Sequence, residues 1–111
     1  MFDFQKLKVY HKAIDFNREV RAVLTQLSDK STKDQLIRAA QSIVLNIAES
    51  SSRFSKADRK RFLIISRGSA FECAALLEYL EKCDEIAFDD GLYANLEEIS
   101  KMIYGIIKNL E

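Results

Sequence analysis

Proline is absent from this sequence of 111 residues, and glycine occurs only three times. A β-rich protein of this length needs many tight turns, and tight turns draw on both residues. Their scarcity argues against a β-rich fold. It favours a few long helices joined by short loops.

The sequence also lacks an excess of charge of either sign, because 17 Lys and Arg balance 17 Asp and Glu. A neutral total argues against indiscriminate nucleic-acid binding. The charges are unevenly spread, however. Residues 1–61 hold 13 basic and 7 acidic residues, a net charge of +6, and the remainder holds 4 and 10, a net charge of −6. This asymmetry is compatible with a local basic patch or a head-to-tail contact between subunits.

No apolar run approaches the roughly 18 residues of a membrane span, and the first residues have no apolar core like that of a signal peptide. We therefore expect a cytoplasmic protein without membrane contact. Only two cysteines are present, Cys73 and Cys83. On one helix they would lie about 15 Å apart, too far for a disulfide. We expect both to be small buried hydrophobic residues in a reducing compartment.

Apolar residues make up 48% of the chain and recur at helical spacing in four segments. The pattern predicts helices over residues 6–27, 33–52 and 56–86, and a fourth from the "DDG" at 89–91 to about 110. Ser31 or Thr32 is the expected cap of the second helix, Ser55 of the third, and Asp89 or Asp90 of the fourth. Short loops between amphipathic helices predict an all-α, antiparallel up-down four-helix bundle that forms one domain over residues 1–111.

One face of each predicted helix supplies the core. On the first helix this face carries Val9, Phe16, Val20, Val23 and Leu27. On the third it carries Phe62, Ile65, Ser69, Cys73, Leu76, Leu77 and Leu80. Gly68 and Ser69 lie in the middle of the third helix, where small residues allow another helix to approach closely. The first helix has a second, mixed stripe that we interpret as a subunit contact, with scattered exposure as the alternative. This stripe consists of Leu7, Tyr10, Ile14, Asn17 and Arg21.

The stretch "RAAQSIVLNIAESSSR" at 38–53 carries a polar row on an otherwise apolar helix. Its members Arg38, Ser42, Asn46 and Glu49 are spaced by three or four residues, so neighbours can touch. Arg67 and Glu72 on the third helix offer complementary charge. We favour a hydrogen-bonded seam that fixes how helices or subunits meet, because buried polar groups need partners. The alternative is a row that faces a ligand.

The stretch "RFSKADRKR" places basic residues around the predicted start of the third helix. A helix N-terminus with Lys and Arg side chains suits phosphate groups. Phe54 either stacks on a base or forms a hydrophobic staple at the helix start. The stretch is therefore a candidate nucleic-acid contact, and a solvated charged face is the alternative. The candidate residues are Arg53, Lys56, Arg59, Lys60 and Arg61.

Residues that typically perform catalysis are sparse. His11 is the single histidine, no Glu-x-x-His pair exists, and no phosphate-binding or dinucleotide-binding loop is visible. Glu49 and Glu72 are the acidic residues nearest an apolar face, and two carboxylates make a poor metal site. We predict no enzyme, no metal, no cofactor and no catalytic residue.

Three blocks, "LKVYHKAIDF", "LIRAAQSIVLNIAESSSR" and "RFLIISRGSAFE", occur in an order and at a spacing that resemble the bundle proteins encoded in intervening sequences of bacterial 23S ribosomal RNA genes, the S23 ribosomal protein family. The resemblance implies a four-helix bundle that assembles as a ring-like homopentamer, without established enzymatic activity. It extends distantly to a nucleic-acid-binding accessory subunit of diversity-generating retroelements. Ser50 and Ser52 replace glycines usual in the family, which predicts a more defined turn or a longer second helix.

These observations together predict a non-enzymatic, self-associating bundle that serves as a nucleic-acid-associated accessory, with RNA or DNA as partner. The alternative is a protein-binding adaptor whose acidic third and fourth helices dock a basic partner.

Overall fold

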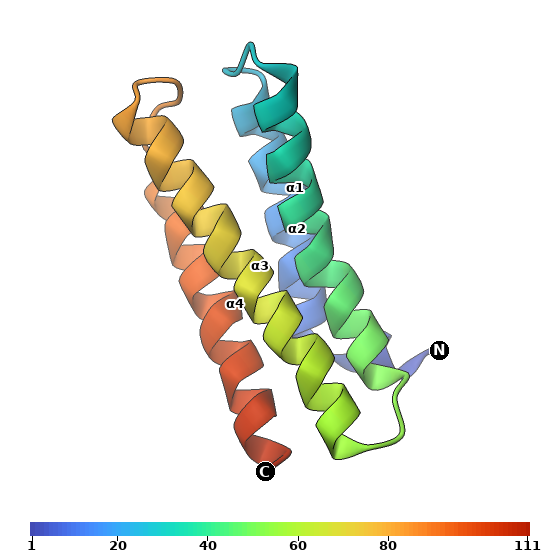
Figure 1. Cartoon of the computed structure of the whole chain (residues 1–111). Coiled ribbons are helices and arrows are strands. Elements are labelled where there is room, and N and C mark those ends of the chain that lie inside the picture. Colours follow the sequence, from blue (N-terminus) through green and yellow to red (C-terminus); the bar gives the residue numbers. More distant parts are fainter.

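The computed structural model describes residues 1–111 and contains helices only. A short 3-10 helix, η1 (Asp3–Lys6), precedes α1 (Lys8–Leu24), α2 (Lys30–Ser51), α3 (Lys56–Lys82) and α4 (Asp90–Asn109). The long helices run alternately up and down, and both chain termini lie at the end that holds the α2–α3 loop (Figure 1). The structure confirms the predicted antiparallel four-helix bundle.

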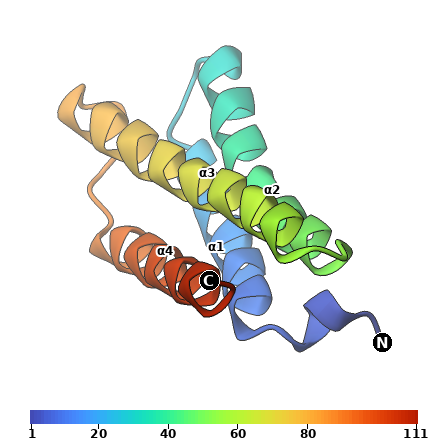
Figure 2. The same cartoon turned by 60° about the horizontal axis from the view of Figure 1, so that its bottom comes forward.

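Each long helix packs against its neighbour in sequence, and α4 closes the circuit against α1. The small helix η1 packs against α1 and α2. It lies next to the N-terminus, at the end of the bundle that faces the viewer in Figure 2. One apolar core runs through the whole bundle. Its fully buried large side chains are Val9, Phe16, Val20, Leu36, Ile43, Ile47, Leu63, Leu77, Leu80, Ile99 and Ile103. No helix combines the length and apolarity needed to cross a membrane.

Side-chain caps set where α2, α3 and α4 begin. The Ser55 hydroxyl accepts from the amide of Asp58 at 3.0 Å, and Asp89 accepts from the amide of Leu92 at 3.2 Å. Both predicted caps are confirmed. The start of α2 was predicted wrongly, because Asp29 rather than Ser31 or Thr32 is the cap. Its carboxylate accepts from both of those amides, and α2 therefore begins at Lys30.

The other helix ends also differ from the prediction. The first helix occupies Lys8–Leu24 rather than 6–27, and the third ends at Lys82 rather than at 86. Beyond α3, Asp84 has φ 59°, the left-handed conformation that stops a helix. The C-terminus of α2 lies at Ser51, one residue before the predicted end at 52. Ser50 and Ser51 lie within α2, and the Ser50 hydroxyl donates to the carbonyl of Ile47 at 2.7 Å.

The buried face of α3 is rotated relative to the prediction over its first half. Leu63 and Ser66 are buried, whereas Phe62 is half-buried and Ile65 is exposed. The run "RFLIIS" is apolar on nearly every side, so periodicity alone does not select the inward residue there. Further along, Ser69, Cys73, Leu77 and Leu80 are buried as predicted, and the buried stripe of α1 matches as well.

Candidate functional site

A chain of hydroxyl and amide groups joins α2 to α3. The hydroxyls of Ser42 and Ser69 lie 2.7 Å apart. The side-chain amide of Asn46 donates to both the carbonyl and the hydroxyl oxygen of Ser42, at 2.8 and 3.0 Å. One turn away, the fully buried hydroxyl of Ser66 donates to the carbonyl of Ile43 at 2.8 Å. We call these four residues, Ser42, Asn46, Ser66 and Ser69, the serine seam.

The remaining members of the predicted polar row lie outside the serine seam. Arg38, Glu49 and Glu72 are exposed, and Glu49 pairs with Arg53 one turn further along the chain, at 2.7 Å. Sequence reasoning did not single out Ser66. Its signal was the recurrence of small residues at 66, 69, 70 and 73, which is the spacing of a close helix–helix contact.

Arg67 faces the opposite neighbour of α3, the helix α4. Its guanidinium carbon lies 4.7 Å from the ring centre of Phe71 and 5.5 Å from that of Tyr104. It forms no ion pair, and its Nε is buried without a hydrogen-bond partner. The predicted contact of Arg67 and Glu72 with the polar row of α2 does not form: Arg67 lies against Phe71 and Tyr104, and Glu72 is exposed.

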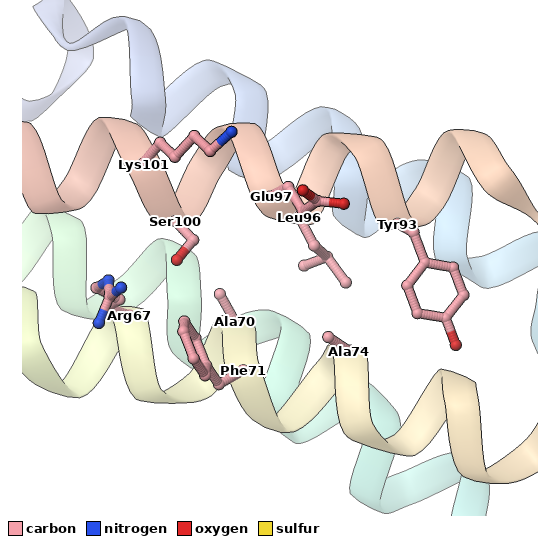
Figure 3. A pocket seen from close by; sticks show the side chains of 9 residues that line it. All are labelled: Arg67, Ala70, Phe71, Ala74, Tyr93, Leu96, Glu97, Ser100 and Lys101. Carbon is pink, nitrogen blue, oxygen red and sulfur yellow. The ribbon is translucent and has the colours of Figure 1, made fainter.

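Arg67 stands at one end of a groove between α3 and α4 with a volume of about 360 Å³ (Figure 3). Ala70 and Ala74 of α3 and Leu96 of α4 lie along it, and the Ser100 hydroxyl points toward α3. Tyr93 lies at the other end. Burial, with the nearby Glu78 and Glu81 carboxylates, raises the pKa of Tyr93, and its hydroxyl is buried without a partner. The full lining is Arg67, Ala70, Phe71, Ala74, Tyr93, Leu96, Glu97, Ser100 and Lys101.

The basic cluster lies at the start of α3, where most of its members are paired. Arg53 contacts Glu49 and Asp58, at 2.7 and 3.9 Å, and Arg61 contacts Asp58 at 3.1 Å. Both guanidinium groups also lie 4.4 Å from the centre of the Phe62 ring.

The other three basic residues of the cluster differ in their partners. Lys60 lies 3.7 Å from Glu111, and the Arg59 Nε donates to the carbonyl of Arg53 at 2.7 Å. Lys56 makes no ion pair. Phe54, in the loop before α3, is fully exposed, so the hydrophobic-staple interpretation of this residue is wrong. The cluster therefore presents Lys56 and an unpacked aromatic ring at the bundle end.

The second stripe of α1 is largely used within the chain. The Asn17 amide donates to the carbonyls of Ala13 and Ala40, the latter in α2, at 2.8 and 2.9 Å. Leu7 and Tyr10 pack against the core, and the Tyr10 ring meets Phe4 of η1 at 4.9 Å. Ile14 is half-buried and Arg21 is exposed.

Exposed apolar side chains gather on α3 instead. Ile64 is 57% exposed, Phe71 55% and Tyr79 62%, while α1 carries no large hydrophobic residue of comparable exposure. Ile64, Gly68, Phe71, Ala75 and Tyr79 follow one another at steps of three or four residues. We call them the α3 outer stripe. A Cβ built on Gly68 meets no atom within 4 Å, so the stripe has an open gap at its middle.

His, Cys, Asp and Glu are the side chains that typically hold metal ions. No three His, Cys, Asp or Glu side chains gather in a way that would hold a metal ion. The His11 Nε2 lies 2.6 Å from the carbonyl oxygen of Gln5. Cys73 is buried, which raises the pKa of its thiol to about 12. Cys83 is exposed, so the expectation that both thiols are buried is wrong for this residue.

Comparison with known proteins agrees with this architecture. The 23S rRNA-intervening sequence protein family matches residues 5–105. A crystal structure from Bacteroides thetaiotaomicron, described as a protein of unknown function from the S23 ribosomal protein family, superposes with a TM-score of 0.81. The two chains are 26% identical, and the alignment covers 90% of this chain and 95% of that one. A comparison with curated proteins finds no match. This chain belongs to the 23S rRNA-intervening sequence protein family.

Proposed function

We propose that this protein is a non-enzymatic subunit that assembles with copies of itself through the α3 outer stripe. The observation that carries the proposal is Gly68 between the exposed apolar side chains of Ile64 and Phe71. A glycine inside a helix costs about 1 kcal/mol relative to alanine. Nothing in its own chain needs the small residue, since the space around it is open. A helix from another subunit could approach α3 closely at Gly68, between the exposed side chains of Ile64 and Phe71, and this contact would explain the glycine.

A ring of five subunits, as the family resemblance implies, needs two different contact faces on each chain. The α3 outer stripe supplies one face in this proposal. Leu45 of α2 is 62% exposed and is a candidate for the opposite face. The second stripe of α1 stays a weaker candidate, because Asn17 and Tyr10 already have partners within the chain.

Solution mass by light scattering tests this assembly. We expect a mass near five chains for the natural protein and a smaller mass for Gly68→Leu and Ile64→Glu. Gly105→Leu is the matched control, since Gly105 also lies in open space but on α4. Helical circular dichroism checks that each variant folds. A monomeric natural protein, or full assembly of both α3 variants, would contradict the proposal.

A second function, contact with RNA or DNA, is favoured at the end of the bundle that holds the α2–α3 loop. The fully exposed Phe54 ring beside the unpaired Lys56 is the observation that favours it. Exposed aromatic rings stack on single-stranded bases, and cationic side chains follow the phosphates. The five basic residues face only Glu49, Asp58 and Glu111, which leaves a net charge of about +2 per chain. Assembly would multiply that charge.

Fluorescence anisotropy with a structured ribosomal RNA fragment tests this contact. Phe54→Ala and Lys56→Ala should each weaken binding, and added salt should weaken it further because phosphate contacts release counterions. Lys82→Ala, at the far end of α3, is the matched control and should bind as the natural protein does. An assembled protein that ignores RNA would instead favour the adaptor, with the acidic α3–α4 end docking a basic protein.

A further inference from the structure

We propose that the groove between α3 and α4 binds a nucleoside phosphate, with Arg67 holding the phosphate. This inference rests on the proposed nucleic-acid role and assigns it a second site. The groove lies midway along α3 and α4, whereas the basic cluster lies at the start of α3. The two sites share no residue.

The first step is the state of Arg67. Its guanidinium lies against the rings of Phe71 and Tyr104 and forms no ion pair. Aromatic rings hold the planar group in place without using its N–H donors, and those donors match the oxygen atoms of a phosphate. Both other arginines of α3, by contrast, already have polar partners: Arg59 donates to a carbonyl oxygen and Arg61 pairs with Asp58. Arg67 is therefore the α3 arginine that is oriented and still unpaired.

The second step is the shape of the groove. Its volume of about 360 Å³ lies within the range of small-molecule sites, about 300–1,000 Å³. The short side chains of Ala70 and Ala74 leave room on the α3 side of the groove, and Leu96 supplies an apolar surface on the α4 side (Figure 3). A flat base or sugar fits beside these side chains, whereas free phosphate would leave this surface uncovered.

The third step is the polar groups along the α4 rim. The Ser100 hydroxyl points toward α3 and can donate to a phosphate oxygen held by Arg67. Lys101 also lines the groove but directs its ammonium away from α3 (Figure 3), and Glu97 can accept from sugar hydroxyls or base N–H groups. Tyr93 closes the far end with a hydroxyl that has no partner in the chain. A cationic end at Arg67 and an apolar middle with the Glu97 acceptor beside it match the parts of a nucleoside phosphate.

Isothermal titration calorimetry of the full chain with adenosine 5′-monophosphate, uridine 5′-monophosphate and inorganic phosphate tests the proposal. We expect at least one nucleotide to bind and inorganic phosphate to bind more weakly. Arg67→Gln should weaken nucleotide binding at least about tenfold, as expected for loss of charge-assisted hydrogen bonds. Arg67→Lys keeps the positive charge but lacks the planar guanidinium, so its nucleotide affinity should lie between those of the natural protein and Arg67→Gln. Arg38→Gln, an exposed arginine on α2, is the matched control and should bind normally. Circular dichroism verifies folding.

A short single-stranded RNA in the same experiment separates the two sources of such a ligand. Mononucleotide binding that Arg67→Gln abolishes supports a site for free nucleotides. Strand binding that depends on Arg67, with no mononucleotide binding, supports a site for one nucleotide within a strand. No dependence on Arg67 with either ligand overturns the proposal.

The proposals of self-assembly and of RNA contact at the basic cluster are tested by variants that should not affect the groove. Ile64→Glu, at a stripe residue that does not line the groove, should disperse the assembly and leave mononucleotide binding intact. Lys56→Ala should weaken binding of the ribosomal RNA fragment and leave mononucleotide binding intact. Loss of nucleotide binding in Ile64→Glu would contradict a groove that is complete within one chain.

Discussion

Asn46 acts on the α2–α3 contact through another residue of its own helix. Its amide donates to the Ser42 hydroxyl oxygen, and that hydroxyl is the group that meets Ser69 across the helix interface. An amide that occupies one lone pair of Ser42 favours donation of the Ser42 proton toward Ser69. The Ser69 hydroxyl in turn reaches the carbonyl of Ile65 at 3.1 Å.

We predict that Asn46→Ala lowers the free energy of unfolding by about 0.5–1.5 kcal/mol, the usual net contribution of such hydrogen bonds. Urea denaturation followed by circular dichroism measures it. Gln41→Ala, an exposed change on the same helix, should alter stability little. Equal stability of the natural protein and Asn46→Ala would show that the serine seam contributes no stability through this residue.

The two thiols should differ sharply in reactivity. Cys83 is exposed, whereas burial raises the pKa of Cys73 to about 12. The thiolate is the reactive form, so a disulfide reagent near pH 8 should modify one thiol quickly and the second only on unfolding. Cys83→Ser should remove the fast phase. The Cys73 thiol ionises near pH 9 in the unfolded chain but stays protonated in the folded protein up to about pH 12. Ionisation therefore favours the unfolded chain, and the free energy of unfolding should fall as the pH rises from about 9 to 12.

The sequence predicted part of the serine seam and little of the groove. Ser42 and Asn46 stood out because they are polar on an otherwise apolar helix, and Ser69 because it is small. Arg67 could not be assigned to its face, since that depends on the rotation of α3, which the apolar run at 62–65 leaves ambiguous. The groove needs both α3 and α4 in place, and no local pattern in either helix describes it.

At the scale of the helices, the starts of α3 and α4 were predictable because capping is local chemistry. Ser55 and Asp89 were recognised from residues directly before an amphipathic segment. Asp29 was missed because two other good capping residues follow it at 31 and 32. The Asp29 carboxylate accepts from the amides of Ser31 and Thr32 and from the Thr32 hydroxyl. A single serine hydroxyl could not accept all three hydrogen bonds.

Removal of the α3 cap should shorten or fray the first turn of that helix. We predict that Ser55→Ala lowers the free energy of unfolding by about 1 kcal/mol, because the Asp58 amide loses its acceptor. Ser28→Ala, an exposed serine in the α1–α2 loop, makes the same chemical change without a cap and should be neutral. Thermal unfolding of the two variants side by side gives the comparison.

Asp29 should make α2 sensitive to acid. The hydrogen bond from the Thr32 hydroxyl, followed by the two backbone amides, lowers the pKa of this carboxyl below its ordinary value of 3.8. A depressed pKa contributes stability above the unfolded value, and that stability is lost as pH falls through the folded value. Asp29→Asn should therefore show a smaller loss of melting temperature between pH 5 and about pH 2 than the natural protein. Identical acid profiles would contradict this role.

At the scale of the whole molecule, the fold followed from sequence because four periodic segments without proline admit few other architectures. The exposed faces did not follow. The second, mixed stripe on α1 was interpreted as a subunit contact, but its Asn17 donates to the α2 carbonyl of Ala40 within the chain. The outward stripe of α3 was hidden among apolar residues on all sides of the same helix. Separating surface from core required knowledge of which neighbours each helix has.

The basic and acidic residues that are unevenly spread along the sequence lie at opposite ends of the bundle. Arg53, Lys56, Arg59, Lys60 and Arg61 lie at the end of the bundle with the α2–α3 loop (Figure 1). Glu78, Glu81, Asp84, Glu85, Asp89 and Asp90 lie around the α3–α4 loop, at the opposite end. Subunits could therefore associate in two ways, head to tail through these ends or side by side through the α3 outer stripe.

Salt distinguishes these two modes of assembly. Contacts between opposite charges weaken as ions screen them, with a Debye length of about 10 Å at 0.1 M and about 3 Å at 1 M. Burial of apolar side chains such as Ile64 and Tyr79 is not weakened in this way. We predict that the mass measured by light scattering stays constant from about 50 mM to about 500 mM NaCl, a range over which the screening length shortens roughly threefold. RNA contact at Lys56 should weaken over the same range. An assembly that dissociates in step with RNA release would instead point to head-to-tail charge pairing and leave Gly68 unexplained.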